Sequence, residues 1–288
     1  SYGFSVSALS LMKSYFSDRW QRVKINKSYS SWFALLVGVP QGSIWGPFIF
    51  NLYMNDLFYN IDSDVCNLAD DTTPFEVEMC LDKLMNKLEL TAEKALNWFE
   101  YNGMKLNSKK CRLIVSGYKK ECMIGKIDTS RIIETHLVKL LGVKIDSNLK
   151  FNAHLTSICK KAAQKLNALS RLCSFLPLAQ RKSLMSAFFL SQFSFCPLVW
   201  MFHSRTLNRK INNLHYRALR VVYRDQTSSY IHLLTKDGSV NIHHRNLQSL
   251  AIEIYKVYQG VAPSFMSNII GIHTNVTTEN ESANTPGK

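Results

Sequence analysis

The first part of the chain changes from a helical to an extended hydrophobic pattern. Between residues 5 and 17, apolar side chains recur at steps of three and four, the period of one helix face. These positions are Val6, Leu9, Met12 and Phe16. The next stretch, RWQRVKI (19–25), alternates polar and apolar residues, which is typical of a strand or an extended arm. A helix followed by an extended segment is therefore predicted.

Two segments with marked turn residues come next. GVPQGSIWGPFIFNLYMNDLF (38–58) begins with closely spaced Gly and Pro and continues as an apolar run, which predicts a tight turn leading into a helix. VCNLADDTTPFEVE (65–78) has two short β-rich runs on either side of Asp70 and Asp71. Because Asp tolerates the backbone angles of tight turns, this pattern predicts a β-hairpin.

A long amphipathic helix is predicted from residue 81 to residue 99. Its apolar side chains are three or four positions apart with Lys and Glu between them, and Asn102-Gly103 follows as a stop signal. Strands are predicted for CRLIVSG (111–117) and HLVKLLGVKID (136–146). The first 150 residues are therefore expected to be α+β, an antiparallel sheet with helices.

After about residue 150 the pattern is helical. Stretches at 154–175, 178–203, 206–224 and 245–259 have helical spacing and few acidic residues. The polar, apolar-poor sequence at 271–288 predicts an unstructured tail. We expect two domains, an α+β domain at 1–150 and an all-α domain at 151–270.

The charge distribution adds a candidate partner. The chain carries 35 Lys and Arg against 21 Asp and Glu, a formal net charge of +14, and residues 151–288 hold 16 basic against 5 acidic side chains. Such a field suits nucleic acid, although ribosome-like and membrane-surface proteins share it. Two uncharged runs, at 28–55 and 183–203, contain Gly, Pro or several Ser, so buried core is predicted there and no membrane span.

The cysteines exclude two classes of protein. There are seven, an odd number, and no pair has C-x-x-C spacing, which argues against a disulfide framework and against a zinc ribbon. We expect reduced thiols that are mostly buried.

The adjacent carboxylates of Asp70 and Asp71 are the clearest candidate chemistry. Two carboxylates this close raise each other's pKa unless a cation lies between them, and Mg²⁺ with its preference for oxygen ligands fits best. Acidic clusters of this kind hold the metals of two-metal phosphoryl-transfer sites. An exposed Asp-Asp turn without a role is the competing interpretation.

The surrounding motifs resemble those of one enzyme family. GVPQGSIWGPFIFNLYMNDL is similar to the motif G-x-P-Q-G-S-x-x-G-P-x-x-F of reverse transcriptases of non-LTR (LINE, jockey-like) retrotransposons, and LADD is similar to their (F/Y)ADD box. WFEYNGMKLNSKK, KLLGVKID and RALRVVY match further family elements in the same order, so that the resemblance covers about residues 1 to 270. The family implies a polymerase palm followed by a thumb-like helical domain.

The resemblance also implies a reaction and roles at the metal and nucleotide. The reaction would be DNA synthesis on an RNA template from a DNA primer and dNTP, with two Mg²⁺ ions held by Asp70 and Asp71, inside the cell in the cytoplasm or nucleus. The family places Gln41, Gly42 and Ser43 against the template and the incoming nucleotide, although a Gly/Pro turn capping a core helix would have the same residues. It places Lys110 near the triphosphate, where a solvated lysine beside Lys109 is equally compatible.

Two further implied roles concern the nucleic-acid strands. KLLGVKID resembles the primer-grip hairpin, with Leu141 and Gly142 under the primer end; an ordinary core strand ending in a turn is the alternative. The thumb-like helices would contact the phosphate backbone. The candidate side chains are Lys160, Lys161, Arg217, Arg220 and Arg224.

The sequence departs from the family pattern at several points. The third catalytic carboxylate of the family belongs to an earlier motif of the form F-D-x-x-x-D, which is not found here, and Leu68 and Pro74 are unusual beside the ADD box. We therefore expect a C-terminal portion of such an enzyme that is inactive alone. A non-enzymatic nucleic-acid-binding remnant is the alternative, and an unrelated basic protein with a chance motif match is a third. The oligomeric state cannot be deduced.

Overall fold

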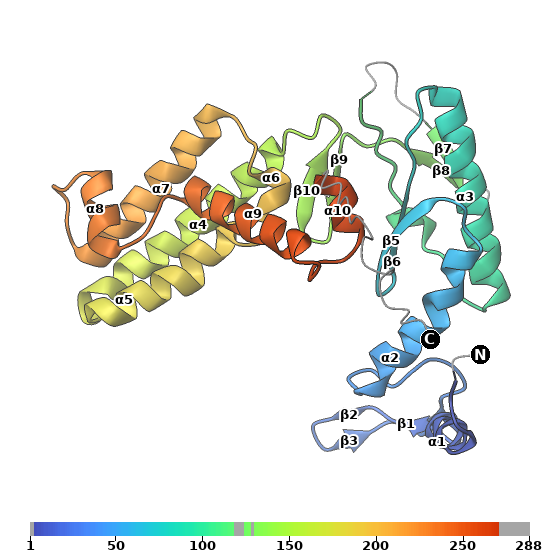
Figure 1. Cartoon of the computed structure of the whole chain (residues 1–288). Coiled ribbons are helices and arrows are strands. Elements are labelled where there is room, and N and C mark those ends of the chain that lie inside the picture. Colours follow the sequence, from blue (N-terminus) through green and yellow to red (C-terminus); the bar gives the residue numbers. More distant parts are fainter. Residues whose placement is uncertain (1–2, 118–123, 128–129, 271–288) are drawn as a thin grey trace, which may run out of the picture. The chain divides into compact units, whose positions relative to one another are not determined.

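A computed structural model describes residues 3–117, 124–127 and 130–270, and the predicted tail at 271–288 lies outside them (Figure 1). The backbone divides into two compact units. The first contains residues up to 113 and the strands between 124 and 134; the second contains residues 114–117 and the chain from 135 onward. Helices and small antiparallel strand pairs build the structure, which confirms the α+β class. The second unit starts before residue 150 because a hairpin packs on its first helix.

The chain begins as predicted, with helix α1 (Val6–Phe16) and an extended arm. Ser5 caps α1, because its Oγ accepts a hydrogen bond from the Ala8 N–H at 3.3 Å. Four short strands then form one antiparallel hairpin, in which the first pairs with the fourth and the second with the third. They are β1 (Trp20–Gln21), β2 (Lys24–Ile25), β3 (Ser28–Tyr29) and β4 (Phe33–Ala34).

The middle of the first unit has its own small hydrophobic core. The predicted turn and apolar helix are present as α2 (Trp45–Met54), followed by a 3₁₀ turn, and the predicted hairpin is present as β5 (Asp64–Leu68) and β6 (Asp71–Phe75). The predicted amphipathic helix is α3 (Leu81–Tyr101), which ends before Gly103. Side chains from these segments meet in one cluster, formed by Met54, Leu57, Ile61 and Trp98, with Phe50, Val65 and Phe99 packed against it.

The strand predicted at 111–117 is wrong. After a 3₁₀ turn (Ser108–Lys110), the chain is extended there, but only Leu113 makes a β-bridge, to Glu134. An extended segment without a continuous partner forms no ladder of hydrogen bonds. The remaining strands of the first unit, β7 (Ile124–Ile127) and β8 (Ser130–Ile133), pair with each other.

The single strand predicted over 136–146 is a hairpin, β9 (Leu137–Leu140) and β10 (Val143–Asp146). The chain reverses at Leu141 and Gly142, whose φ angles are +46° and +93°. Two positive φ angles define a type I′ turn, which usually contains Asn or Gly at the first position. Leu141 is not a residue type that indicates such a turn, so the residue pattern alone predicted one strand, whereas the resemblance of KLLGVKID to a hairpin agrees with the structure.

The second unit is otherwise helical, as predicted, and is built on α4 (Asn152–Leu172). Leu155, Ala162 and Leu166 of α4 are fully buried against residues of later helices, among them Phe189 and Leu219. The stretch predicted as one helix at 178–203 is broken by a π-helical turn, a 3₁₀ turn and Pro197, and α8 was not predicted. The later helices are α5 (Leu178–Leu184), α6 (Pro197–Trp200), α7 (Arg205–Tyr223), α8 (Tyr230–Asp237), α9 (Ile242–Tyr258) and α10 (Phe265–Ile270).

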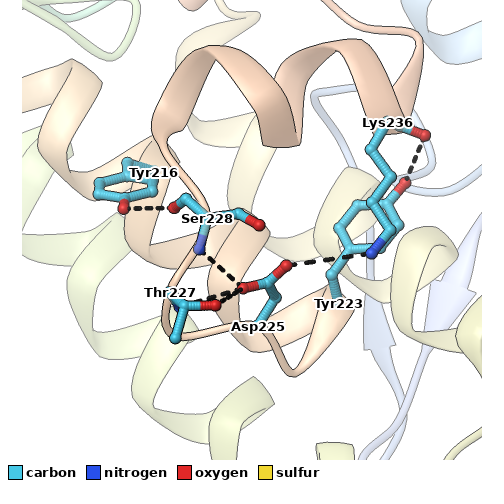
Figure 2. Close-up of polar contacts among 6 residues, drawn as sticks. All are labelled: Tyr216, Tyr223, Asp225, Thr227, Ser228 and Lys236. Atoms are coloured by element: carbon cyan, nitrogen blue, oxygen red, sulfur yellow. Dashed lines mark hydrogen bonds and ion pairs between the residues drawn. The ribbon is translucent and has the colours of Figure 1, made fainter.

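A carboxylate organises the corner between α7 and α8 (Figure 2). Oδ1 of Asp225 accepts hydrogen bonds from the N–H of Ser228 at 2.9 Å and of Thr227 at 3.0 Å. These bonds, that of Ser228 first, hold the pKa of Asp225 well below its usual range. Tyr216 closes the corner by donating its hydroxyl to the Ser228 carbonyl at 2.7 Å.

The two uncharged runs, 28–55 and 183–203, were both predicted to be buried core, and the structure confirms this prediction only for the second. Met185, Phe189 and Trp200, within 183–203, are buried as predicted. Residues 28–55 are mostly exposed, including Leu36 at 88% and Ile44 at 94%. The prediction of buried core was therefore wrong there, because within this segment only Phe50 and Met54 belong to the hydrophobic cluster of the first unit. Across the described ranges, no helix has the length and apolar character that crossing a membrane requires.

The described cysteines are free thiols, as expected, but most are not buried. Cys159 and Cys173 are buried in the helical core. Burial raises the pKa of both thiols. Three others, Cys66, Cys80 and Cys196, are exposed.

Candidate functional site

The two aspartates lie at the turn of the β5–β6 hairpin. Leu68 pairs with Asp71, so Ala69 and Asp70 form a two-residue loop and Asp71 is the first residue of β6. Ala69 has φ of +55°, the arrangement of a type II′ turn at a position that usually contains Gly. An alanine in this conformation costs roughly 1 kcal/mol, so the surrounding hairpin stabilises a strained turn. Both carboxylates are exposed at the tip.

Pro74 is compatible with this hairpin. In a two-residue hairpin the pair that closes the loop exchanges hydrogen bonds, and the following pairs alternate between bonded and non-bonded. Pro74 faces Val65, three pairs beyond the closing pair of Leu68 with Asp71, which is a non-bonded position. The N–H that proline lacks would have pointed away from β5, so the ladder loses nothing.

The donor set at the turn is compatible with a divalent metal but incomplete. Asp70 and Asp71 offer hard, exposed oxygen atoms, the ligand type that Mg²⁺ prefers. Within the described ranges, no group of three or more His, Cys, Asp or Glu side chains is placed to hold a metal ion. Asp70 and Asp71 therefore form a pair without a third carboxylate in that part of the chain.

The Gly-rich loop before α2 has the backbone freedom that the sequence suggested. Gly38 and Gly42 have φ of +82° and +80°, a conformation that other residues rarely adopt. Gly46 is needed for space: a Cβ there would lie 3.0 Å from the Ser43 Oγ and 3.2 Å from the Pro40 carbonyl oxygen. The loop is therefore built around glycines at its bends and at the start of α2.

Ser43 stabilises the loop itself. Its hydroxyl donates to the Pro40 carbonyl at 2.8 Å and accepts from the Gly46 N–H at 2.9 Å, so it links the loop to the first turn of α2. Gln41 and Gly42 are exposed beside it. The loop thus presents Gln41 and the Gly42 backbone to solvent, while the Ser43 side chain is engaged within the loop.

Sequence reasoning missed Arg19 as part of this loop. Its guanidinium donates to the Gly38 carbonyl at 2.6 Å and to the Phe16 carbonyl at 3.3 Å, and so links the end of α1 to the loop. The partners are three and nineteen residues away, and no local pattern signals the longer contact. Arg19 is a positioning residue for the Gly-rich loop.

Lys110 ends the 3₁₀ turn after α3, and its side chain is exposed. Its backbone N–H donates to the Asn107 carbonyl at 2.9 Å, which fixes the turn but leaves the ammonium group in solvent.

Contacts at both ends of β10 hold the β9–β10 hairpin in place. A Cβ on Gly142 would lie 3.3 Å from the Phe195 ring, so the turn passes close to that side chain. At the other end of β10, both carboxylate oxygens of Asp146 accept backbone N–H groups, of Lys150 at 3.1 Å and Phe151 at 2.6 Å. Leu141 is 47% exposed at the tip. The hairpin is thus tied to the start of α4 and presents its turn to solvent.

The five candidate cations of the helical unit divide into two groups. Lys160 and Lys161 are exposed on α4. The three arginines have intramolecular partners: Arg217 donates to Asn167 Oδ1 at 2.8 Å, Arg220 to the Gln226 carbonyl and Arg224 to the Cys173 carbonyl. The arginines therefore link α7 to α4 and to the neighbouring turns, a role that the sequence did not reveal.

Comparison with known proteins identifies the family. The reverse transcriptase (RNA-dependent DNA polymerase) family matches residues 3–145. The chain is 25% identical over 56% of its length to the RNA-directed DNA polymerase from mobile element jockey of Drosophila melanogaster, covering 19% of that protein. It is 25% identical over 74% of its length to the jockey polymerase of Drosophila funebris, covering 24%.

A third relative matches a larger share of the chain. The probable RNA-directed DNA polymerase from transposon BS of Drosophila melanogaster is 22% identical over 81% of this chain and is covered to 27%. The chain thus spans about a fifth to a quarter of the length of these relatives. No solved structure matches. The family match together with these relatives shows that the chain belongs to the reverse transcriptases of non-LTR retrotransposons.

Proposed function

We propose that the chain forms part of an RNA-directed DNA polymerase in which Asp70 and Asp71 bind catalytic Mg²⁺. The observation that supports this most is the β5–β6 hairpin, which places both carboxylates at one exposed, strained turn. Backbone strain of this kind persists where the surrounding structure enforces it, and often at functional sites. The family membership supplies the reaction, and RNA template, DNA primer and dNTP are the substrates that we infer from it.

Other residues of the chain have positioning roles in this proposal. The exposed Gln41 and the flexible backbone at Gly42 lie against the template and the incoming nucleotide, because a loop without a Cβ admits a close approach. Ser43 and Arg19 hold that loop in shape. Lys110 faces the triphosphate, and the Leu141-Gly142 turn supports the primer end.

The metal requirement explains why we expect the 288-residue chain alone not to polymerise. When bound, Mg²⁺ neutralises developing charge and aligns the attacking and leaving oxygens of an in-line displacement. The ion needs about six oxygens, and two exposed aspartates supply few of them. In the described residues no third carboxylate joins Asp70 and Asp71, so metal affinity is weak and the geometry of attack is poorly fixed.

A chimera tests this function. Joining the chain to an upstream reverse transcriptase segment that carries the strand aspartate of the family should give Mg²⁺-dependent primer extension on RNA. Within the chimera, Asp70→Asn should abolish extension and leave nucleic-acid binding nearly unchanged, because a metal ligand is lost but no surface cation. Asp64→Asn is the matched control, since Asp64 is exposed at the other end of the same hairpin.

Two outcomes would contradict the proposal. Primer extension by the bare chain would show that the two carboxylates need no partner from elsewhere. Equal activity of the chimera with Asp70→Asn would show that the acidic turn does not bind the catalytic metal. An inactive chimera that still binds nucleic acid would favour the alternative, a non-enzymatic nucleic-acid-binding protein, which the excess of 16 basic over 5 acidic residues after residue 150 also supports.

A further inference from the structure

The β1–β4 arm exposes an unusual set of large aromatic side chains. Trp20 is 59% exposed, Tyr29 50%, Trp32 58% and Phe33 69%, all within fifteen residues of one hairpin. Tryptophan and tyrosine normally bury most of their surface in a folded domain, because each removes a large apolar area from water. A gathering of exposed aromatic rings on one arm points to recognition of a partner.

A β-bulge brings two of these rings together. Trp20 pairs with Ala34, and Lys24 pairs with Tyr29, so four steps on the outgoing strand face five steps on the returning strand. The extra residue lies at Ser31–Trp32, opposite Arg22, because Ser30 is still paired with Val23: its backbone N–H donates to the Val23 carbonyl at 3.0 Å and its side chain accepts from the Val23 N–H at 2.9 Å. One extra residue reverses the alternation of side chains. Tyr29 and Trp32 therefore project from the same face, although they are three positions apart.

Arg22 lies between the two rings. Its guanidinium carbon is 4.1 Å from the centre of the Tyr29 ring and 4.6 Å from that of Trp32. The Lys24 ammonium is 5.2 Å from the Tyr29 ring. The face thus carries a ladder of Trp32, Arg22, Tyr29 and Lys24, in which each cation contacts an aromatic ring and reduces the freedom of its neighbours.

The charge around this ladder favours an anionic partner. The sequence contains no Asp or Glu between Arg19 and Asp56, while Lys27 adds a further cation at the exposed tip of the hairpin. Unpaired nucleotides complement such a surface, because each has a base whose π-face can stack on an aromatic ring and a phosphate that can contact the cations. In a duplex the faces of the bases are already stacked on neighbouring base pairs and cannot stack on the protein. A duplex can therefore interact with this surface only through its phosphate charges.

We propose that this arm binds an unpaired stretch of nucleic acid, with bases stacking on Tyr29 and Trp32 and with Arg22, Lys24 and Lys27 facing its phosphates. The inference rests on the proposed function for the class of partner. The binding surface itself is separate in sequence from the acidic hairpin and the Gly-rich loop. It predicts a preference for single strands over duplexes that the cationic helices alone would not produce.

The test measures binding of the whole 288-residue chain to labelled 20-nucleotide single strands of RNA and of DNA without internal structure, and to a duplex of equal length, by fluorescence anisotropy. Tyr29→Ala with Trp32→Ala should weaken single-strand binding by about 10-fold or more and duplex binding by less than about 2-fold. Because stacking is not Coulombic, the loss should be the same at about 50 mM and at about 200 mM salt.

Three controls separate stacking from folding and from charge. Tyr29→Phe with Trp32→Phe keeps both rings and should restore most of the single-strand affinity. Tyr101→Ala removes a ring that is 92% exposed elsewhere in the same unit and should change nothing. In addition, single strands should quench the tryptophan fluorescence of the native chain. Trp32→Phe should remove the part of this quenching that comes from Trp32.

The outcomes distinguish this inference from the proposed function. If the native chain binds no nucleic acid, both fail. If it binds but the double alanine variant loses single strands and duplexes equally, or loses neither, the inference alone is wrong. If the variant binds single strands normally but no longer self-associates, or no longer binds anionic vesicles or an acidic protein, the arm serves that partner and the inference is overturned.

Discussion

Between α7 and α8 the backbone is not helical, and the Asp225 carboxylate accepts hydrogen bonds from backbone N–H groups there. Oδ1 of Asp225 accepts from two backbone N–H groups, and its other oxygen lies 4.0 Å from the Lys236 ammonium (Figure 2). The hydrogen bonds from Ser228, and after them those from Thr227, favour the charged form and lower the pKa of Asp225. A carboxylate whose pKa is lowered by folding stabilises the folded state at neutral pH.

This effect predicts how stability depends on acidity. The contribution of the Asp225 charge should be complete above the unfolded-state pKa of about 3.9 and should decrease as pH falls through the lower folded-state pKa. Asp225→Asn keeps an acceptor oxygen but loses the charge. The gap in unfolding temperature between the native chain and this variant should therefore narrow below about pH 4. Measured by circular dichroism, a gap that widens on acidification would contradict the assignment.

At the scale of elements, the sequence predicts the helices and strands whose formation depends on neighbouring residues. It does not predict features that depend on a contact with a residue far along the chain. The acidic hairpin was predictable because β-formers flank two aspartates, and its turn holds Asp70 and Asp71 as expected. The β9–β10 reversal did not follow from local residue types, because Leu141 adopts positive φ without being a residue that usually does so; only the family resemblance of KLLGVKID indicated a hairpin there. The partner of Arg217 is Asn167, fifty residues earlier, so nothing local showed that this arginine links two helices.

The different surroundings of the cations on α4 and α7 lead to a prediction for each group. Arg220→Lys with Arg224→Lys keeps the charge but loses the bonds to the Gln226 and Cys173 carbonyls, and should lower the free energy of unfolding by roughly 2 kcal/mol. Lys160→Ala with Lys161→Ala should leave stability within about 0.5 kcal/mol, since both side chains are exposed. Urea denaturation measures both. Equal destabilisation by the two pairs would contradict these roles.

For the molecule as a whole, the distribution of charge separates general affinity from the proposed chemistry. The acidic turn lies in the part of the chain whose net charge is small, with 19 basic and 16 acidic residues before residue 151. The later residues carry 16 basic against 5 acidic side chains. A concentrated positive field attracts any polyanion and contributes affinity without sequence preference. Selectivity for single strands must then come from other features, such as the aromatic arm.

The last prediction concerns salt. If about six phosphates are contacted, the affinity of the whole chain for a duplex should fall by on the order of 10³-fold between about 50 and about 200 mM salt, because each contact releases condensed counterions. Lys160→Ala with Lys161→Ala should reduce the slope of log affinity against log salt by about two. Tyr29→Ala with Trp32→Ala should leave that slope unchanged, since rings release no counterions. Anisotropy titrations of the three proteins measure these slopes, and an affinity that ignores salt would show that the positive charge of the helical unit does not contact nucleic acid.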